Sequence, residues 1–260
     1  MALLEIKDLS IHFGGVKAVQ NVTFSVEKGD FIGLIGPNGA GKTTVFNAVT
    51  GVVRPTSGEI FFDGHCLNNM RPDKISHLGI ARTFQNIRIY PKMSALDNVA
   101  IGLDSQAAYN TISAMLGLPR VRRRDKEIRD ICLNFLKQVG IEQYKDAEVG
   151  SLPYGIQRKV EIARALATGP QLLFLDEPAA GMNTAESIEL VSFLRDLHKS
   201  TGIAIVLIEH HLEVVMEVCQ NIHVLNLGQM LASGTPEEIQ KNQAVITAYL
   251  GERRKRSDRS

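Results

Sequence analysis

Residues 36–44, GPNGAGKTT, place a lysine and two threonines directly after closely spaced glycines, a pattern suited to binding phosphate groups. Gly39 and Gly41 allow the backbone to curl until its N–H groups converge on phosphate oxygens. Lys42 can reach the β- and γ-phosphates of a nucleotide, and the Thr43 hydroxyl can bind Mg²⁺. The predicted phosphate-binding residues are Gly36, Pro37, Asn38, Gly39, Ala40, Gly41, Lys42, Thr43 and Thr44. A chance glycine-rich turn is the alternative, but it would not explain the strand predicted before the motif and the helix predicted after it.

The stretch LLFLDEP, residues 172–178, adds an acidic pair at the end of an apolar strand. Asp176 can hold Mg²⁺ through a water molecule, and Glu177 can polarise an attacking water molecule. The alternative is that the pair forms a turn or caps a helix. The sequence contains no N-K-x-D element for guanine recognition. The two motifs together therefore predict a nucleotide hydrolase and disfavour a guanine-specific GTPase.

For the two motifs to act on one nucleotide, the strands before them must end side by side in the fold. FIGLIG, residues 31–36, is typical of a short buried parallel strand, and residues 42–52 have the apolar spacing of a helix. Residues 171–178 and 203–211 contain two further apolar strands, with a helix predicted between them over 185–200. This alternation of strand and helix predicts a parallel sheet.

The remaining segments surround this α/β core. Residues 1–35 alternate apolar and polar side chains between glycine turns, which predicts antiparallel strands. From about residue 94 to 165 the apolar side chains recur at helical spacing, so a helical segment is inserted into the core. The basic run 117–126 is predicted to be a solvated loop, with contact to a partner or to lipid head groups as the alternative. The basic tail 251–260 lacks apolar residues and is predicted to be disordered.

The composition narrows the class of protein. The 260 residues include 29 Lys and Arg against 28 Asp and Glu, a balance that disfavours a nucleic-acid-binding domain. The charged N-terminus does not resemble a secretory signal, and no apolar run reaches the roughly 18 residues of a spanning helix. We therefore expect a soluble chain that contacts a membrane only through partners. The three scattered cysteines predict reduced thiols.

The order of GPNGAGKTT, TFQ, LPYGIQRKVEIARAL, LLFLDEP and LIEHH resembles the ATP-binding cassette of ABC transporters. The resemblance covers residues 4 to about 250. It implies a P-loop NTPase (RecA-like) core at 1–85 and 166–250, an N-terminal antiparallel β part, and a helical subdomain at about 86–165. FGGVKAV, DEPAAGMN and the ending GTPEEIQKNQAVITAYLGE look like the ATPases of branched-chain amino acid importers. Urea and amide importers look similar.

The resemblance also assigns roles to single residues. Phe13 matches the aromatic residue that stacks on adenine, although it could instead be a core aromatic on a strand. Gln85 matches the glutamine that contacts Mg²⁺ and the attacking water, and on its own it would be a surface amide. His210 matches the switch histidine that donates to the γ-phosphate, whereas a histidine at a strand end is usually structural. Glu177 takes the role of catalytic base.

The signature motif L-S-G-G-Q departs from the family pattern. Its positions hold Leu152, Pro153, Tyr154, Gly155 and Ile156. In this family two cassettes meet head to tail, so Pro153, Tyr154 and Gly155 would face the ATP of a partner. Proline offers neither an N–H nor a hydroxyl, so we expect the working partner to be a different cassette with a more regular signature. Two smaller departures are Asn183, where aspartate is frequent, and His211, which follows the switch histidine.

The resemblance therefore implies an ATP-hydrolysing subunit that uses ATP and Mg²⁺ and drives a permease embedded in the membrane. Its place would be the cytoplasmic face of the inner (plasma) membrane, as a peripheral subunit. The expected cargo is a branched-chain amino acid or a related small solute. An ATPase of a lipopolysaccharide-type exporter and a soluble ABC protein acting on ribosomes or DNA remain alternatives.

Overall fold

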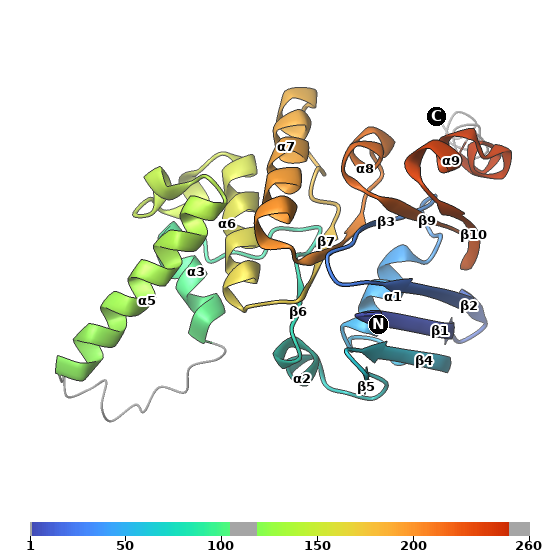
Figure 1. The fold of residues 1–260 in the computed structure, drawn as a ribbon, viewed down its shortest axis with the longest axis horizontal. Helices are drawn as coiled ribbons and strands as arrows, with labels where there is room; N and C mark the ends of the chain where they lie inside the picture. The colour runs from blue at the N-terminus through green and yellow to red at the C-terminus, as the bar shows by residue number, and fades with distance from the viewer. Residues whose placement is uncertain (1, 105–118, 250–260) are drawn as a thin grey trace.

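The strands form two sheets that lie side by side (Figure 1). The structure is a computed structural model that describes the backbone of residues 2–104 and 119–249, and the side chains of 2–103 and 126–249. The smaller sheet is antiparallel, with strand order β2-β1-β4-β5. Its strands are β1 (Leu4–Phe13), β2 (Val16–Val26), β4 (Ser57–Phe62) and β5 (His65–Cys66). The predicted antiparallel part near the N-terminus is thus confirmed.

The larger sheet has the strand order β10-β9-β3-β8-β7-β6. Neighbouring strands in it run parallel, except for the antiparallel pair β9 and β10. Its strands are β3 (Phe31–Ile35), β6 (Ile80–Arg82), β7 (Leu172–Asp176), β8 (Ala204–Ile208), β9 (Asn221–Asn226) and β10 (Gln229–Gly234). Because β3, β7 and β8 are parallel neighbours, their carboxyl ends open at one edge, where the loops after them can meet. The predicted parallel sheet is confirmed.

The helices flank the larger sheet or gather beside it. They are α1 (Lys42–Val49), α2 (Pro72–His77), α3 (Ala95–Asp104), α5 (Pro119–Gln138), α6 (Tyr154–Ala167), α7 (Thr184–Thr201), α8 (Leu212–Val218) and α9 (Pro236–Lys241), with 3₁₀ turns η1 (Glu142–Tyr144) and η2 (Val149–Ser151). In Figure 1, α3, α5 and α6 form a group at the end opposite the antiparallel sheet. Within the described part of the chain, no helix has the length and apolar character needed to cross a membrane.

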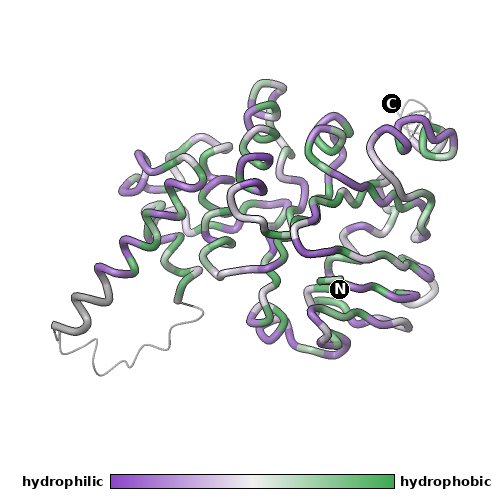
Figure 2. The backbone as a smooth tube through the Cα atoms, viewed as in Figure 1, coloured by the Kyte–Doolittle hydropathy of each residue, from purple (hydrophilic) through white to green (hydrophobic). Residues whose placement is uncertain are grey.

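The larger sheet separates two apolar cores. Along β7, Leu173 and Leu175 belong to the core shared with α3, α5, α6 and α7, while Leu172 and Phe174 belong to the core shared with α1 and the antiparallel sheet. This alternation follows from the two-residue period of a strand. Helix α7 covers the first face with leucines three and four residues apart, and its hydrophobic and hydrophilic stretches alternate along the tube in Figure 2. A sheet buried on both faces explains the wholly apolar strands of the sequence.

The basic run 117–126 was expected to be a loop, and this expectation is wrong for the described residues of the run. The backbone from Pro119 onward belongs to helix α5, while residues 117 and 118 lie outside the described part. Arginine and lysine are good helix formers, and proline suits the first helical position, so these residues extend the helix. The tail 251–260 also lies outside the described residues.

A half-buried histidine makes the stability of the fold depend on pH. The ring of His223 on β9 lies 4.8 Å from that of Phe24, and its Nδ1 lies 2.8 Å from Ser233 Oγ. Burial lowers the pKa of His223 from 6.5 to about 4, with Asp30 opposing the effect in part. Below about pH 6.5 the imidazole of His223 therefore binds a proton in the unfolded chain. In the folded chain the same imidazole stays neutral until the pH falls to about 4. We expect this group to remove about 3 kcal/mol from the free energy of unfolding between pH 7 and pH 4.

Urea unfolding at pH 7 and at pH 4.5 measures this effect. The variant His223→Gln cannot titrate in this range, so it should lose less stability than the unchanged chain between the two pH values. An equal loss in both proteins would show that other groups cause the pH dependence.

Candidate nucleotide-binding and catalytic site

The predicted phosphate loop connects the end of β3 to the start of α1. Gly36 has φ 149°, and a Cβ there would lie 2.0 Å from the carbonyl oxygen of Leu225. Gly41 has φ 102°, and a Cβ there would lie 2.6 Å from the carbonyl oxygen of Ala18 on β2. The loop is thus pressed between β9 and β2, and only glycine fits these two positions.

Lys42 lies inside this loop. Its side chain is 5% exposed, and its ammonium donates to the carbonyl oxygens of Gly36 at 2.7 Å and Pro37 at 3.1 Å. The ammonium is therefore held at the point around which the loop backbone curls. The two threonines begin α1, with the Thr43 side chain exposed and the Thr44 side chain half-buried. A cation and a hydroxyl at a helix N-terminus form a surface suited to an anion.

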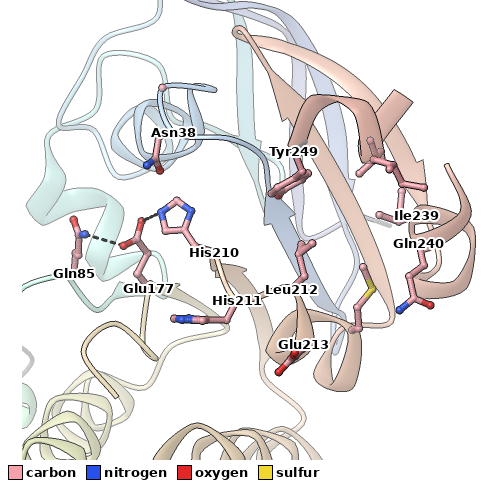
Figure 3. A pocket seen from close by; sticks show the side chains of 14 residues that line it. Asn38, Gln85, Glu177, His210, His211, Leu212, Glu213, Ile239, Gln240 and Tyr249 are labelled. Atoms are coloured by element: carbon pink, nitrogen blue, oxygen red, sulfur yellow. Dashed lines mark hydrogen bonds and ion pairs between the residues drawn. The ribbon is translucent and has the colours of Figure 1, made fainter. Parts of the chain in front are cut away.

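The predicted catalytic residues meet at the end of β7 (Figure 3). Glu177 has φ 48°, and its N–H donates to the carbonyl oxygen of Ile208 at the end of β8. One carboxylate oxygen of Glu177 accepts from Gln85 Nε2 at 2.7 Å, and the other lies 2.5 Å from His210 Nε2. A left-handed backbone at a non-glycine residue is strained, and such strain clusters at functional sites. The structure thus brings together Gln85, Glu177 and His210 from three loops.

These residues line one end of an open pocket of about 1160 Å³. Asn38 and Gly39 of the phosphate loop line it together with Gln85, Glu177 and His210. Its remaining walls come from the start of α8 and from the segment after β10 that includes α9 (Figure 3). The pocket therefore joins the phosphate loop to the acidic residue that would activate water.

Asp176 precedes Glu177 in the chain but is not among the described residues that line this pocket. Its side chain is buried, and its Oδ2 forms an ion pair with Arg82 Nη2 at 2.6 Å. Arg82 also donates to Asn47 Oδ1 on α1 at 2.6 Å, so it ties β7 to the helix that follows the phosphate loop. No sequence motif indicated a role for Arg82. Its only signal was a charged residue at the end of the apolar segment GIAR.

Glu209 is a second residue beside the site that no sequence motif indicated. Its side chain is 1% exposed, and both of its carboxylate oxygens accept hydrogen bonds from backbone N–H groups beside the site. One oxygen accepts from the N–H of Ala179 at 2.7 Å and the other from the N–H of His210 at 3.0 Å. The same oxygen lies 3.3 Å from Nδ1 of His211. Glu209 therefore joins the loop after Glu177 to the loop of His210, and its signal was an acidic residue ending a buried strand.

Phe13 and the signature residues lie apart from this cluster. Phe13 is the last residue of β1 and is 51% exposed. Pro153 precedes the first turn of α6, and Tyr154 and Gly155 begin it. None of these residues is among the described residues that line the pocket. Asn183 caps α7 by accepting from the N–H of Glu186, so its position has a local structural reason.

Comparison with known proteins agrees with the fold and identifies the family. The family described as ABC transporter matches residues 19–180, and the family described as branched-chain amino acid ATP-binding cassette transporter matches residues 229–255. The chain is 40% identical over 250 residues to the high-affinity branched-chain amino acid transport ATP-binding protein BraF of Pseudomonas aeruginosa, covering 96% of this chain and 98% of that protein. The corresponding protein LivG of Escherichia coli (strain K12) gives the same identity and coverage.

A solved structure agrees as well. The ADP conformation of MJ1267, an ATP-binding cassette of an ABC transporter, superposes with a TM-score of 0.83 at 29% identity, covering 96% of this chain and 99% of that one. The two sheets, the phosphate loop and the acidic end of β7 define a P-loop ATPase. With matches over nearly its full length, the chain belongs to the ABC transporter family, as its ATP-binding and ATP-hydrolysing subunit. The resemblance and the ATP-hydrolysing activity predicted from the sequence are confirmed.

Proposed function

We propose that this ATPase powers the uptake of branched-chain amino acids, or of a closely related small solute, through a permease. The observation that supports hydrolysis is the Glu177 carboxylate held between Gln85 and His210. The cargo class is supported by the match of residues 229–255 to the branched-chain family and by the names of the relatives.

The site residues divide the work of phosphoryl transfer to water. Glu177 accepts a proton from the attacking water, since its carboxylate lies at the pocket surface beside the phosphate loop. Gln85 and His210 hold that carboxylate and the γ-phosphate in line with the water. Lys42 and the loop N–H groups stabilise the charge on the β- and γ-phosphates. Phe13 offers an exposed flat face for adenine.

The residues present fit a Mg²⁺ ion. Among the described residues, no cluster of three or more His, Cys, Asp or Glu could hold a metal by itself. Mg²⁺ prefers a few oxygen ligands together with phosphate and water, which matches Thr43, Gln85 and Asp176. Asp176 has one oxygen occupied by Arg82, so the other is the one that would serve the ion. When bound, the ion neutralises charge on the β- and γ-phosphates.

The partner cassette would complete the nucleotide site. Pro153 accepts hydrogen bonds from the N–H groups of Ile156 and Gln157, but it offers no donor. The Ser151 hydroxyl donates to the carbonyl oxygen of Glu148 at 2.7 Å, so it is already used inside the 3₁₀ turn. The N–H groups of Tyr154 and Gly155 in the first turn of α6 are the donors that remain for a partner's γ-phosphate. A homodimer would then contain two weakened sites, which supports a heterodimer.

Replacing Pro153 with serine tests this asymmetry. Each hydrogen bond to a charged group is worth roughly 1.5–3 kcal/mol, so Pro153→Ser should tighten ATP-dependent dimerisation of the chain about tenfold or more. Dimerisation is measured by analytical ultracentrifugation with ATP in the Glu177→Gln background. Ser151→Ala serves as the control and should change little, because that hydroxyl faces Glu148.

The outcome decides between two partners. The contrary result is that the unchanged chain forms a tight ATP-dependent dimer that Pro153→Ser makes no tighter. That result would show that the proline does not weaken dimerisation. The N–H groups of Tyr154 and Gly155 would then be sufficient, and a homodimer would be the simpler assembly.

The permease would dock on the helical side of the molecule, and the chain would sit at the cytoplasmic face of the membrane. A groove of about 670 Å³ there is lined by core residues such as Arg82 and by residues of α3 and α6 such as Gly102 and Arg164. It also includes Phe84, next to Gln85, so a docked helix would contact the loop that reaches Glu177.

We also propose that the cassette spans 4–250, with the core at 1–85 and 166–250 and the helical subdomain at about 86–165.

Purification of the tagged chain from membranes tests the proposed function. A permease and a second cassette should copurify, and the complex in proteoliposomes should hydrolyse ATP faster when its solute-binding protein carries leucine, isoleucine or valine. Stimulation by lipopolysaccharide, or copurification of ribosomal subunits without a permease, would instead support the two alternatives.

A further inference from the structure

Helix α6 carries a fully buried ion pair. Arg158 and Glu161 are 0% and 2% exposed, and Arg158 Nη1 lies 2.7 Å from Glu161 Oε2. Arg158 is the largest of the fully buried side chains. Placing two charges in the interior is costly, and apolar residues of similar volume often serve stability as well or better. Stability alone therefore does not explain why the ion pair is present.

The backbone groups that the pair contacts all belong to one loop. Arg158 donates to the carbonyl oxygen of Phe84 at 2.7 Å and to that of Gln85 at 2.9 Å. Glu161 accepts from the N–H of Arg88 at 3.0 Å. One turn further along α6, the guanidinium of Arg164 donates to the carbonyl oxygen of Arg88. The backbone from residue 84 to 88 is thus attached to one face of α6.

The same loop is attached to the core at its start. The N–H of Thr83 donates to the carbonyl oxygen of Phe174 on β7 at 2.9 Å. Two residues later, the Gln85 side chain reaches Glu177 at 2.7 Å. Gln85 therefore has its backbone held by α6 and its amide held by the residue after β7.

We propose that Arg158 and Glu161 are positioning residues, which hold the backbone of Gln85 so that its amide reaches Glu177. The inference rests on the role proposed above for Gln85. Arg158 Nη2 also lies 3.3 Å from the Tyr154 hydroxyl, so the pair contacts the first residue of α6. If the first turn of α6 shifts when it contacts the nucleotide of the partner cassette, the pair would therefore move Gln85 relative to Glu177.

The experiment replaces both charges together, in the full chain. The double variant Arg158→Met with Glu161→Met leaves no unpaired buried charge, so it should keep the fold. Because misplacement of a reacting group by about 1 Å can cost about 100-fold, we expect kcat for ATP to fall between about 10- and 100-fold. The affinity for ATP should stay within about twofold, because the phosphate loop is untouched. The matched control is Arg195→Met, which breaks an exposed ion pair with Glu217 on the same molecule.

A second experiment, in a chain that also carries Gln85→Ala, distinguishes positioning of Gln85 from a purely structural role of the pair. In the presence of Gln85→Ala, which itself should lower kcat, the double methionine variant should cause no further loss, because the pair acts through Gln85. Arg158→Lys keeps the charge and should restore part of the rate. If the methionine pair does not fold, the double variant Arg158→Leu with Glu161→Leu provides the same comparison, because it also leaves no unpaired buried charge.

Three results would overturn the inference. A folded double variant with unchanged kcat would show that the pair does not position the site. Losses that multiply in the Gln85→Ala background would show that it acts by another route, while leaving the role of Gln85 intact. If Gln85→Ala alone leaves kcat unchanged, the proposed role of Gln85 fails, and this inference fails with it.

Discussion

Glu177→Gln is expected to bind ATP like the unchanged chain and to hydrolyse it about 10² to 10⁴ times more slowly, the usual cost of losing a general base. The amide keeps the size of the carboxylate and can still contact Gln85 and His210, which lie 2.7 Å and 2.5 Å from it. It cannot accept a proton from water. The loss should therefore fall on kcat and spare the affinity for the nucleotide.

Multiple-turnover ATP hydrolysis and titration of ATP measure the two quantities separately. The matched control is Glu213→Gln, which changes an exposed carboxylate in the wall of the same pocket and should leave kcat within about twofold. Near-normal turnover by Glu177→Gln would exclude this carboxylate as the base. A loss of ATP affinity would show that the substitution disturbs the phosphate loop instead.

The proposed phosphate-binding residues and the acidic pair could be predicted because each stands in a local pattern. The phosphate loop and the pair Asp176 and Glu177 follow apolar strands, and the parallel order of β3, β7 and β8 brings these strand ends to one edge. The place of Gln85 and His210 could be predicted only through the family resemblance. Nothing in their immediate neighbours indicates that they meet at Glu177.

The residues that hold the site in place could not be predicted in this way. Arg82 and Asp176 are 94 residues apart, and Arg158 and Gln85 are 73 residues apart. A periodicity reports which face of an element is buried, but not which distant backbone group a buried charge will meet. In LPYGIQRKVEIARAL, Arg158 and Glu161 resemble an exposed i,i+3 pair of a helix surface, whereas both are buried.

The loop expected at 117–126 was wrong for a related reason. Charge alone was taken to predict a solvated loop, although arginine and lysine favour helices and the apolar spacing of α5 begins only after the basic run. Helical turns that carry no apolar stripe leave no periodic signal in the sequence. The start of α5 was therefore invisible, while its apolar second half was predicted.

Lys42→Ala should weaken the binding of ATP itself, in contrast to Glu177→Gln. The lysine ammonium lies inside the phosphate loop on the carbonyl oxygens of Gly36 and Pro37, where it can turn to the β- and γ-phosphates. Losing two hydrogen bonds to charged oxygens, at roughly 1.5–3 kcal/mol each, should raise the dissociation constant by about 10² to 10⁴. The effect should be smaller for ADP, because the γ-phosphate is missing.

Titration of ATP and ADP, with and without Mg²⁺, measures these constants. Lys42→Met keeps most of the aliphatic stem in the buried site, so it separates the loss of charge from the loss of packing. Lys17→Ala removes an exposed lysine from β2 and should leave both affinities unchanged. If Lys42→Ala and Lys42→Met bind ATP as tightly as the unchanged chain, the lysine does not contact the phosphates. The assignment of residues 36–44 as the nucleotide site would then lose its principal cation, whatever the fold resembles.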